Sequence, residues 1–280
     1  MTLFWIAATA LIVAIALIGN NRLVVTRYRV TLPGLAPQAT PRSLGEPALR
    51  IAHLSDLHGK RFGRGDCDRL CSVVRGCAPD LIAVSGDVLN KRRDVTSTAI
   101  AQLRALAVIA PVVFCRGNHD LDPRQWDRLT AALRGERVHL LRNAVESLSV
   151  AGIPLLIGGI DDRAAYGDDE DSFVAALREL SQRASTHPDP RILLAHRPEY
   201  ISDYSRTSFS LSLSGHAHGG QVRVPGIGAL WAPDQGLLPR HADGLHRIDG
   251  LAAVVSRGLG PSTFPIRIAN PPQIIVLECS

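Results

Sequence analysis

The chain has 280 residues, of which 46% are hydrophobic, so it is long enough to bury a large core in one main domain with a small appendage. Its formal charge of +5 favours an acidic partner such as phosphate or an anionic membrane. The sequence has no long basic run with interleaved aromatic residues, so nucleic-acid binding is not expected. None of the five cysteines forms a Cys-x-x-Cys pair, which excludes common zinc fingers and favours free thiols in a reducing compartment.

The first predicted element is an apolar stretch at residues 3–19. It is close to the lower length limit for a membrane-spanning helix, for which about 20 residues are usual. A cleaved signal peptide is the alternative, but no Lys or Arg precedes the stretch and no small-residue cleavage site follows it. We therefore expect residues 1–30 to contain a retained membrane anchor. Arg22, Arg27 and Arg29 follow it, so the positive-inside rule places the main domain on the cytoplasmic side of the inner membrane.

Proline-rich residues 31–48 are typical of a linker. From residue 49, short apolar runs alternate with helical patterns, and this predicts an α/β domain over residues 49–280 with a largely parallel sheet. The expected strands are residues 49–54, 81–84, 112–114, 155–157, 192–195 and 211–213. The expected helices begin at the N-caps Asp66, Asp94, Asp122 and Ser172. Short strands and Gly/Pro turns after about residue 205 predict a second, more antiparallel sheet.

Polar groups follow five of these strands. In chain order they are Asp56-Leu57-His58, Gly86-Asp87, Gly117-Asn118-His119-Asp120, His196 and Gly215-His216-Ala217-His218. Sites in open α/β sheets form beyond the carboxyl ends of the strands, so we expect these groups to converge. Asp56 and His58 lie two apart on an extended segment, which should point both side chains to the same side. The mixed nitrogen and oxygen donors suit manganese, iron or zinc better than calcium or magnesium.

The ordered motifs resemble the calcineurin-like metallophosphoesterase superfamily from residue 51 to near the C-terminus. The resemblance implies a four-layer sandwich, in which helices flank two packed mixed β-sheets. It assigns one divalent metal ion to Asp56, His58, Asp87 and His218, and the other to Asp87, Asn118, His196 and His216. It also makes His119 the acid beside the leaving group, with Asp120 orienting it.

The residues Ser256-Arg257-Gly258-Leu259-Gly260 and Pro271-Pro272 resemble the membrane-anchored bacterial branch of that superfamily. The branch includes pyrophosphatases that act on UDP-2,3-diacylglucosamine. The resemblance therefore implies a metal-dependent phosphodiesterase or pyrophosphatase whose substrate is a lipid or lipid precursor. A broad phosphomonoesterase or nucleotide phosphodiesterase is one alternative. A non-catalytic scaffold is another, but it should have lost ligands, and here all seven and His119 are present.

Two loop regions bear on the substrate. The loops after the first three strands carry basic residues, among them Lys91, Arg92 and Arg116, which would bind substrate phosphate if they form the rim of the site. Ordinary solvated loops are the alternative. Residues 224–239 are unusually apolar for a loop and would contact acyl chains or a bilayer, unless they form a hairpin packed on the core. The exposure of Trp231 distinguishes these two interpretations.

Overall fold

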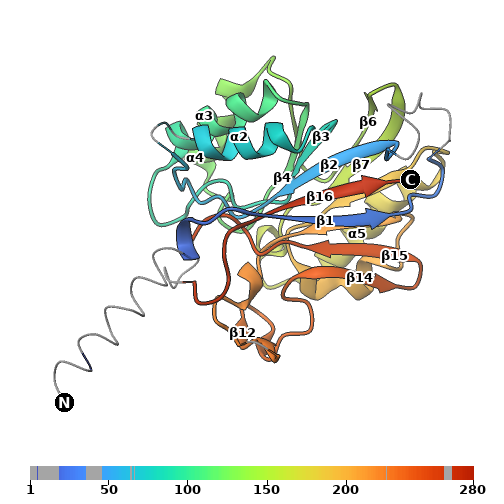
Figure 1. Ribbon diagram of the computed structural model, residues 1–280. Helices are drawn as coiled ribbons and strands as arrows, with labels where there is room; N and C mark the ends of the chain where they lie inside the picture. Colours follow the sequence, from blue (N-terminus) through green and yellow to red (C-terminus); the bar gives the residue numbers. More distant parts are fainter. Residues whose placement is uncertain are drawn as a thin grey trace.

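The computed structural model describes residue 5 and residues 19–35, 46–63, 65, 67–224, 226–261 and 267–280. Two six-stranded sheets dominate this part of the chain (Figure 1). The first contains β1 (Val24–Val30), β2 (Leu49–Leu54), β3 (Leu81–Val84), β4 (Val112–Cys115), β5 (Val138–Leu141) and β16 (Gln273–Cys279), in the order β1-β16-β2-β3-β4-β5. Strands β2 to β5 run parallel, whereas β16 is antiparallel to β2.

The second sheet contains β6 (Ala144–Val150), β7 (Ile153–Gly159), β8 (Arg191–Leu194), β9 (Leu211–Ser214), β14 (Gly244–Ile248) and β15 (Leu251–Val255). Their order is β14-β15-β9-β8-β7-β6. Only the two edge strands are antiparallel to their neighbours, so the centre of this sheet is parallel. The second sheet has two antiparallel strand pairs and the first has one, in agreement with the expectation of a more antiparallel second sheet, although β6, β7 and β8 lie before residue 205.

Helices cover the outer faces of the two sheets. In Figure 1, α2 (Asp68–Gly76), α3 (Thr96–Ala107) and α4 (Pro123–Leu133) lie together beside β3 and β4, on the side of the first sheet away from β14. Helix α5 (Glu170–Ser185) covers the second sheet. The shorter elements are α6 (Ile201–Tyr204), η1 (Arg163–Tyr166), η2 (Pro198–Tyr200) and η3 (His218–Gly220).

Side-chain caps begin α4 and α5, whereas α2 and α3 have Cys67 and Val95 at their N-cap positions without a side-chain cap, so the expected N-cap at Asp94 is wrong. Asp122 accepts a hydrogen bond from the backbone N–H of Gln125 at 3.0 Å, and Pro123 occupies the first turn, as the sequence predicts. The expected cap at Ser172 is wrong, because α5 begins earlier. Asp169 is its N-cap, and its carboxylate accepts from the backbone N–H of Ser172 at 3.1 Å.

Three buried apolar clusters separate four layers. The first packs α2, α3 and α4 on the first sheet, with Leu103 and Ile82 among its members. The second lies between the sheets and includes Val113 and Ile192. The third packs α5 on the second sheet through Leu177 and other residues. This arrangement confirms the predicted α/β fold with two mixed sheets flanked by helices.

The folded domain begins before residue 49. Strand β1 pairs in parallel with β16 from Val24 to Val30, and Leu32 is buried between the sheets. Residues 24–30, which the predicted boundaries assign to the juxtamembrane segment, therefore form an edge strand of the first sheet.

No helix in the described part of the chain is both long and apolar enough to cross a membrane. The stretch predicted as an anchor, residues 3–19, lies outside the described residues except for positions 5 and 19. Two small antiparallel hairpins complete the described structure. They are β10 (Arg223–Val224) with β11 (Gly228–Ala229), and β12 (Trp231–Ala232) with β13 (Gly236–Leu237).

Candidate metal centre

A buried cluster of carboxylates and imidazoles lies where the carboxyl ends of β2, β3, β8 and β9 meet. Its members are Asp56, His58, Asp87, His196, His216 and His218, and each is less than one-tenth exposed. The first three follow strands of the first sheet, and the histidines 196, 216 and 218 follow strands of the second. Both sheets therefore contribute to one site, as strand order predicted.

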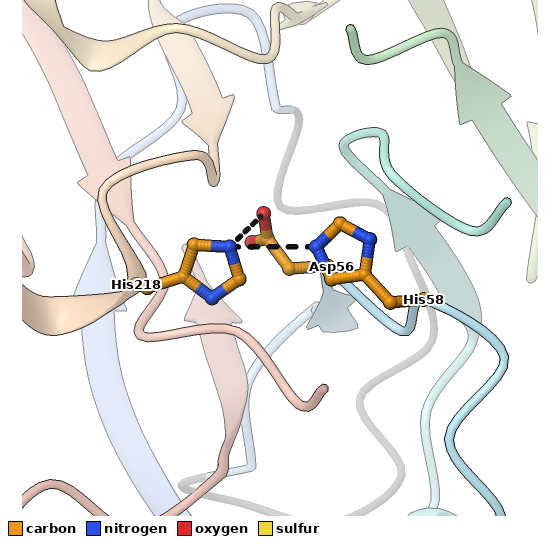
Figure 2. A group of neighbouring side chains, drawn as sticks. All are labelled: Asp56, His58 and His218. Atoms are coloured by element: carbon orange, nitrogen blue, oxygen red, sulfur yellow. Dashed lines mark hydrogen bonds and ion pairs between the residues drawn. The ribbon is translucent and has the colours of Figure 1, made fainter. Parts of the chain in front are cut away.

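One group consists of Asp56, His58 and His218, shown in Figure 2. The two imidazoles approach from opposite sides with their Nε2 atoms 3.4 Å apart, and the carboxylate lies between and behind them. Nε2 of His218 is also 3.4 Å from Oδ1 of Asp56. Two ring nitrogens and a carboxylate oxygen that point at one another form a donor set suited to a transition-metal ion.

Asp87 connects this group to a second one. Its Oδ2 lies 3.7 Å from Nε2 of His58 and 3.3 Å from Nε2 of His196. His196 in turn lies 4.0 Å from Oδ1 of Asp56. Asp87 is thus positioned between two donor groups, where a bridging carboxylate is needed.

The backbone at these residues departs from extended geometry. Five of the cluster residues have φ between 48° and 65°, the left-handed region that non-glycine residues seldom occupy; they are Asp56, His58, Asp87, His216 and His218. Asp56 and His58 converge as predicted, but strand alternation is not the cause. They converge because both residues sit in left-handed turns beyond the strand end, an unfavourable conformation of the kind that concentrates at functional sites.

Two buried polar atoms in the cluster have no hydrogen-bond partner among the described residues: Oδ1 of Asn118 and Nε2 of His196. Leaving such atoms unsatisfied is costly, on the order of 1–3 kcal/mol each. The other ring nitrogen of His196 donates to the carbonyl oxygen of Ser85 at 2.7 Å, which fixes the ring with Nε2 facing Asp87. A buried amide oxygen and a buried imidazole nitrogen without hydrogen bonds are ligand types that fit divalent metal ions.

The charges of the cluster are strongly coupled. Burial opposes ionisation of Asp87, but neighbouring His196 outweighs it and holds the pKa of Asp87 well below its usual range. Burial likewise lowers the pKa of His196, yet Asp87 raises it to about 10. Burial lowers the pKa of His218 to about 3, so this imidazole is neutral at neutral pH and its nitrogen can bind a metal. The carboxylates thus require a buried cation, which is either an imidazolium or a metal ion.

His119 lies beside the cluster, with its ring centroid 4.6 Å from that of His58. Asp120 does not reach this ring. Its carboxylate accepts backbone hydrogen bonds from Asp87 at 2.6 Å, Leu89 at 2.8 Å and Gly117 at 2.8 Å. The expectation that Asp120 orients the imidazole is therefore corrected: Asp120 orders the loops that carry Asp87 and Asn118, because its short side chain turns back onto the backbone.

His216 points partly away from the cluster. Its Nε2 lies 2.8 Å from Oδ2 of Asp234, in the turn between β12 and β13. Arg197 also binds Asp234, and it contacts Asp162 and Glu199 as well. Sequence reasoning missed Arg197 and Asp234. Arg197 directly follows the predicted ligand His196, and Asp234 lies in the apolar segment 224–239. No sequence pattern indicated that these two residues contact each other.

A cavity of about 290 Å³ opens onto the cluster. Lys91 lines it together with Asn118, His119, Arg197 and Asp234.

The other two basic residues expected on the rim lie elsewhere. Arg92 is exposed and lines neither this cavity nor the other large one described below. Arg116 is buried and its guanidinium binds both carboxylate oxygens of Asp161, so its charge is neutralised there. The expectation of a rim cation at Arg116 is therefore corrected.

A family model described as calcineurin-like phosphoesterase matches residues 49–220. The chain therefore belongs to the calcineurin-like phosphoesterase family, and it is a metal-dependent phosphoester hydrolase of the kind that uses two divalent metal ions.

Relatives agree with this assignment. The uncharacterised metallophosphoesterase YkoQ of Bacillus subtilis is 29% identical over 233 residues, covering 81% of this chain and 82% of the relative. The phosphodiesterase YaeI of Escherichia coli is 29% identical over 236 residues, covering 82% of this chain and 81% of the relative. The solved structure of the protein TT1561 from Thermus thermophilus is 16% identical with a TM-score of 0.51, covers 75% of this chain and 90% of that chain, and so shares the fold.

Proposed function

We propose that the chain hydrolyses a phosphodiester or pyrophosphate bond in a membrane lipid or lipid precursor, such as a UDP-diacylglucosamine-like molecule, at the cytoplasmic face of the inner membrane. The observation that carries this proposal is an exposed apolar hairpin beside the metal centre. Trp231, Leu237 and Leu238 on the β12–β13 hairpin are 49%, 81% and 63% exposed. In Figure 1 this hairpin projects from the body of the domain beside β14.

The hairpin is joined directly to the site. Asp234 at its turn binds His216 and Arg197, and Pro233 and Asp234 line the cavity over the metal centre. A substrate whose phosphate reaches this cavity therefore has the apolar side chains of the hairpin next to it. Exposed apolar groups at the edge of a polar site suit acyl chains or a bilayer surface. This favours the acyl-contact interpretation of residues 224–239 over packing on the core.

The residues of the cavity have distinct roles in such a reaction. Lys91 supplies positive charge at the mouth, where phosphate oxygens would lie, whereas Arg197 is paired with Asp162, Glu199 and Asp234. The backbone N–H of Lys91 donates to Nδ1 of His119 at 3.4 Å, so the neutral ring carries its proton on Nε2. From there the ring can donate a hydrogen bond to a phosphate oxygen and stabilise the charge that develops on it. When bound, two divalent metal ions acidify a water and stabilise both oxygens of an in-line displacement.

The first test is metal-dependent hydrolysis of an aryl phosphodiester by the full chain with added manganese. Asp87→Asn keeps the size of the side chain but removes the charge between the two donor groups, so activity should fall by orders of magnitude while the fold survives. Circular dichroism checks the fold. Absence of any metal-dependent phosphoester hydrolysis by the wild type would make the protein a non-catalytic scaffold.

The second test concerns the lipid substrate. In Trp231→Ser/Leu237→Ser, hydrolysis of a diacylated nucleotide-sugar pyrophosphate in mixed micelles should fall about tenfold or more, since each apolar side chain contributes on the order of 1.5–3 kcal/mol when buried. Hydrolysis of the soluble aryl phosphodiester should not change. Val108→Ser is the matched control, because Val108 is 77% exposed on the far end of α3. Equal effects on both substrates would contradict a lipid role for the hairpin.

A further inference from the structure

A second cavity, of about 600 Å³, lies outside the metal centre and shares none of its lining residues with the first. Lys60, Arg61, Arg93 and Arg267 line it, together with Asn20 and Asn21. Its cations come from three separate parts of the chain: the loop after His58, the loop before α3, and the segment that leads into β16. Four cationic side chains thus line one cavity.

No carboxylate of the described residues pairs with Lys60, Arg93 or Arg267. Within the described ranges, Lys60 donates to the carbonyl oxygens of Asn20 and Leu259, and Arg93 donates to the carbonyl oxygen of His58. The one carboxylate in the lining, Asp94, is bound to Arg128 and accepts hydrogen bonds from Thr96 at the start of α3. The positive charge of these three side chains can therefore be balanced by an anionic ligand.

Arg267 is the most buried cation in the lining, with 3% of its surface exposed. Its guanidinium donates to the carbonyl oxygens of Arg257 at 2.7 Å and Gly260 at 2.6 Å. One of its nitrogens lies 3.3 Å from Nδ1 of His218, whose Nε2 faces Asp56. A single imidazole ring thus separates this cationic cavity from the metal centre. Burying a guanidinium without a carboxylate partner is costly, and a bound anion would offset that cost.

We infer that this cavity is a second anion-binding site, which takes the phosphate group of an anionic lipid headgroup or of free phosphate. Lys60 and Arg93 would contact the phosphate oxygens, and Arg267 would supply charge from the floor. Phosphate suits such a site because it accepts several charge-assisted hydrogen bonds at once. The cavity adjoins Asn20 and Asn21, directly after the apolar stretch at residues 3–19, which would place it at headgroup level if that stretch enters a bilayer.

The sequence offers a reporter for each cavity. Lys60 and Lys91 are the only lysines in the chain, and they line the second cavity and the metal-centre cavity respectively. Brief acylation of the full-length metal-loaded protein, read by peptide mass spectrometry, measures the accessibility of each. Inorganic phosphate should slow acylation of Lys60 several-fold. In Asp87→Asn, phosphate should still protect Lys60 even where it no longer protects Lys91, so this site is tested independently of the proposed function.

A second experiment identifies the source of the phosphate. It repeats the acylation with vesicles of phosphatidylcholine alone and with vesicles in which about one lipid in five is phosphatidylglycerol. Protection of Lys60 by the anionic vesicles but not by inorganic phosphate identifies a headgroup site, and protection by both identifies a general phosphate site. Arg93→Ala should abolish protection, whereas Arg92→Ala, the neighbouring exposed cation that lines neither cavity, should keep it. Unchanged acylation of Lys60 with both probes, or full protection in Arg93→Ala, would overturn the inference.

Discussion

His196 Nε2 lies 3.3 Å from Asp87 Oδ2, and this contact joins the two sheets at the metal centre. His196 follows β8 of the second sheet, whereas Asp87 follows β3 of the first. Because Nδ1 of His196 donates to Ser85, the ring cannot turn away, and Nε2 stays aimed at the carboxylate. The pair is therefore both a structural link between the sheets and a preformed part of a metal site.

Removal of metal should lower the thermal stability of the protein. Without metal, buried Asp56 and Asp87 are held by imidazoles, and the Asn118 oxygen has no partner among the described residues. Manganese at a hundred times its dissociation constant should stabilise the fold by about 2.7 kcal/mol per site. Thermal denaturation with manganese or with a chelator measures this difference. The stability of Asp87→Asn should respond much less, and an equal response of both proteins would contradict the assignment.

Gly117→Ala should abolish metal binding without unfolding the protein. A Cβ at this position would lie 2.7 Å from the backbone nitrogen of Asp87 and closer still to its carboxylate, which would have to move. Metal analysis after desalting measures the loss. Gly76→Ala is the matched control, because a Cβ there meets no atom within 4 Å and Gly76 ends α2. That control should keep its metal and should be about as stable as the wild type or slightly more stable. Normal metal content in Gly117→Ala would show that the Asp87 loop can shift.

Much of this fold can be predicted from the sequence because its central strands are short and apolar on both faces. Residues 49–54 and 81–84 were predicted as strands and are strands β2 and β3, since a buried parallel strand reads as an uninterrupted apolar run. The edge strand β1 escaped prediction. Its alternating residues, with Arg27 and Arg29 outward, resemble a charged segment that flanks a membrane anchor, and only pairing with β16 identifies them.

The clustering of the candidate metal ligands was predictable because each follows a strand, and the topology brings the strand ends together. Arg267 and Asp234 were not predictable, because each acts through a long-range contact made by a segment without periodicity. Arg116 shows the opposite failure. It lies next to a predicted ligand motif, but Asp161 neutralises its charge. The sequence alone does not reveal this ion pair.

Asp234→Ala should weaken binding of one metal ion. Asp234 accepts a hydrogen bond from Nε2 of His216, which leaves Nδ1 of that ring available to a metal. Loss of a carboxylate that orients a metal-binding histidine typically costs about 10–100-fold in metal affinity. Titration of the chelator-treated protein with manganese measures the affinity of each site. Asp203→Ala, which removes an aspartate that contacts Arg206, is the control. Unchanged affinity at both sites would show that Asp234 only fastens the hairpin.

The last prediction concerns stability in acid. His53 is fully buried, its Nε2 lies 2.8 Å from Oγ of Ser85, and burial lowers its pKa to about 3. The unfolded chain binds a proton at this residue near its ordinary pKa, whereas the folded chain resists protonation down to the lowered value. The stability that neutral His53 permits is therefore complete above the ordinary pKa and is lost as pH falls toward the folded-state pKa.

This residue alone should cost about 2 kcal/mol of unfolding free energy between pH 7 and pH 5. Urea denaturation in the presence of chelator measures the loss. His53→Asn cannot take up the proton, so its stability should fall less steeply over the same range, whereas His187→Asn, at an exposed position, should follow the wild type. Parallel curves for His53→Asn and the wild type would mean that the folded protein admits the proton after all, and that the core around His53 and Ser85 opens in acid before the domain unfolds.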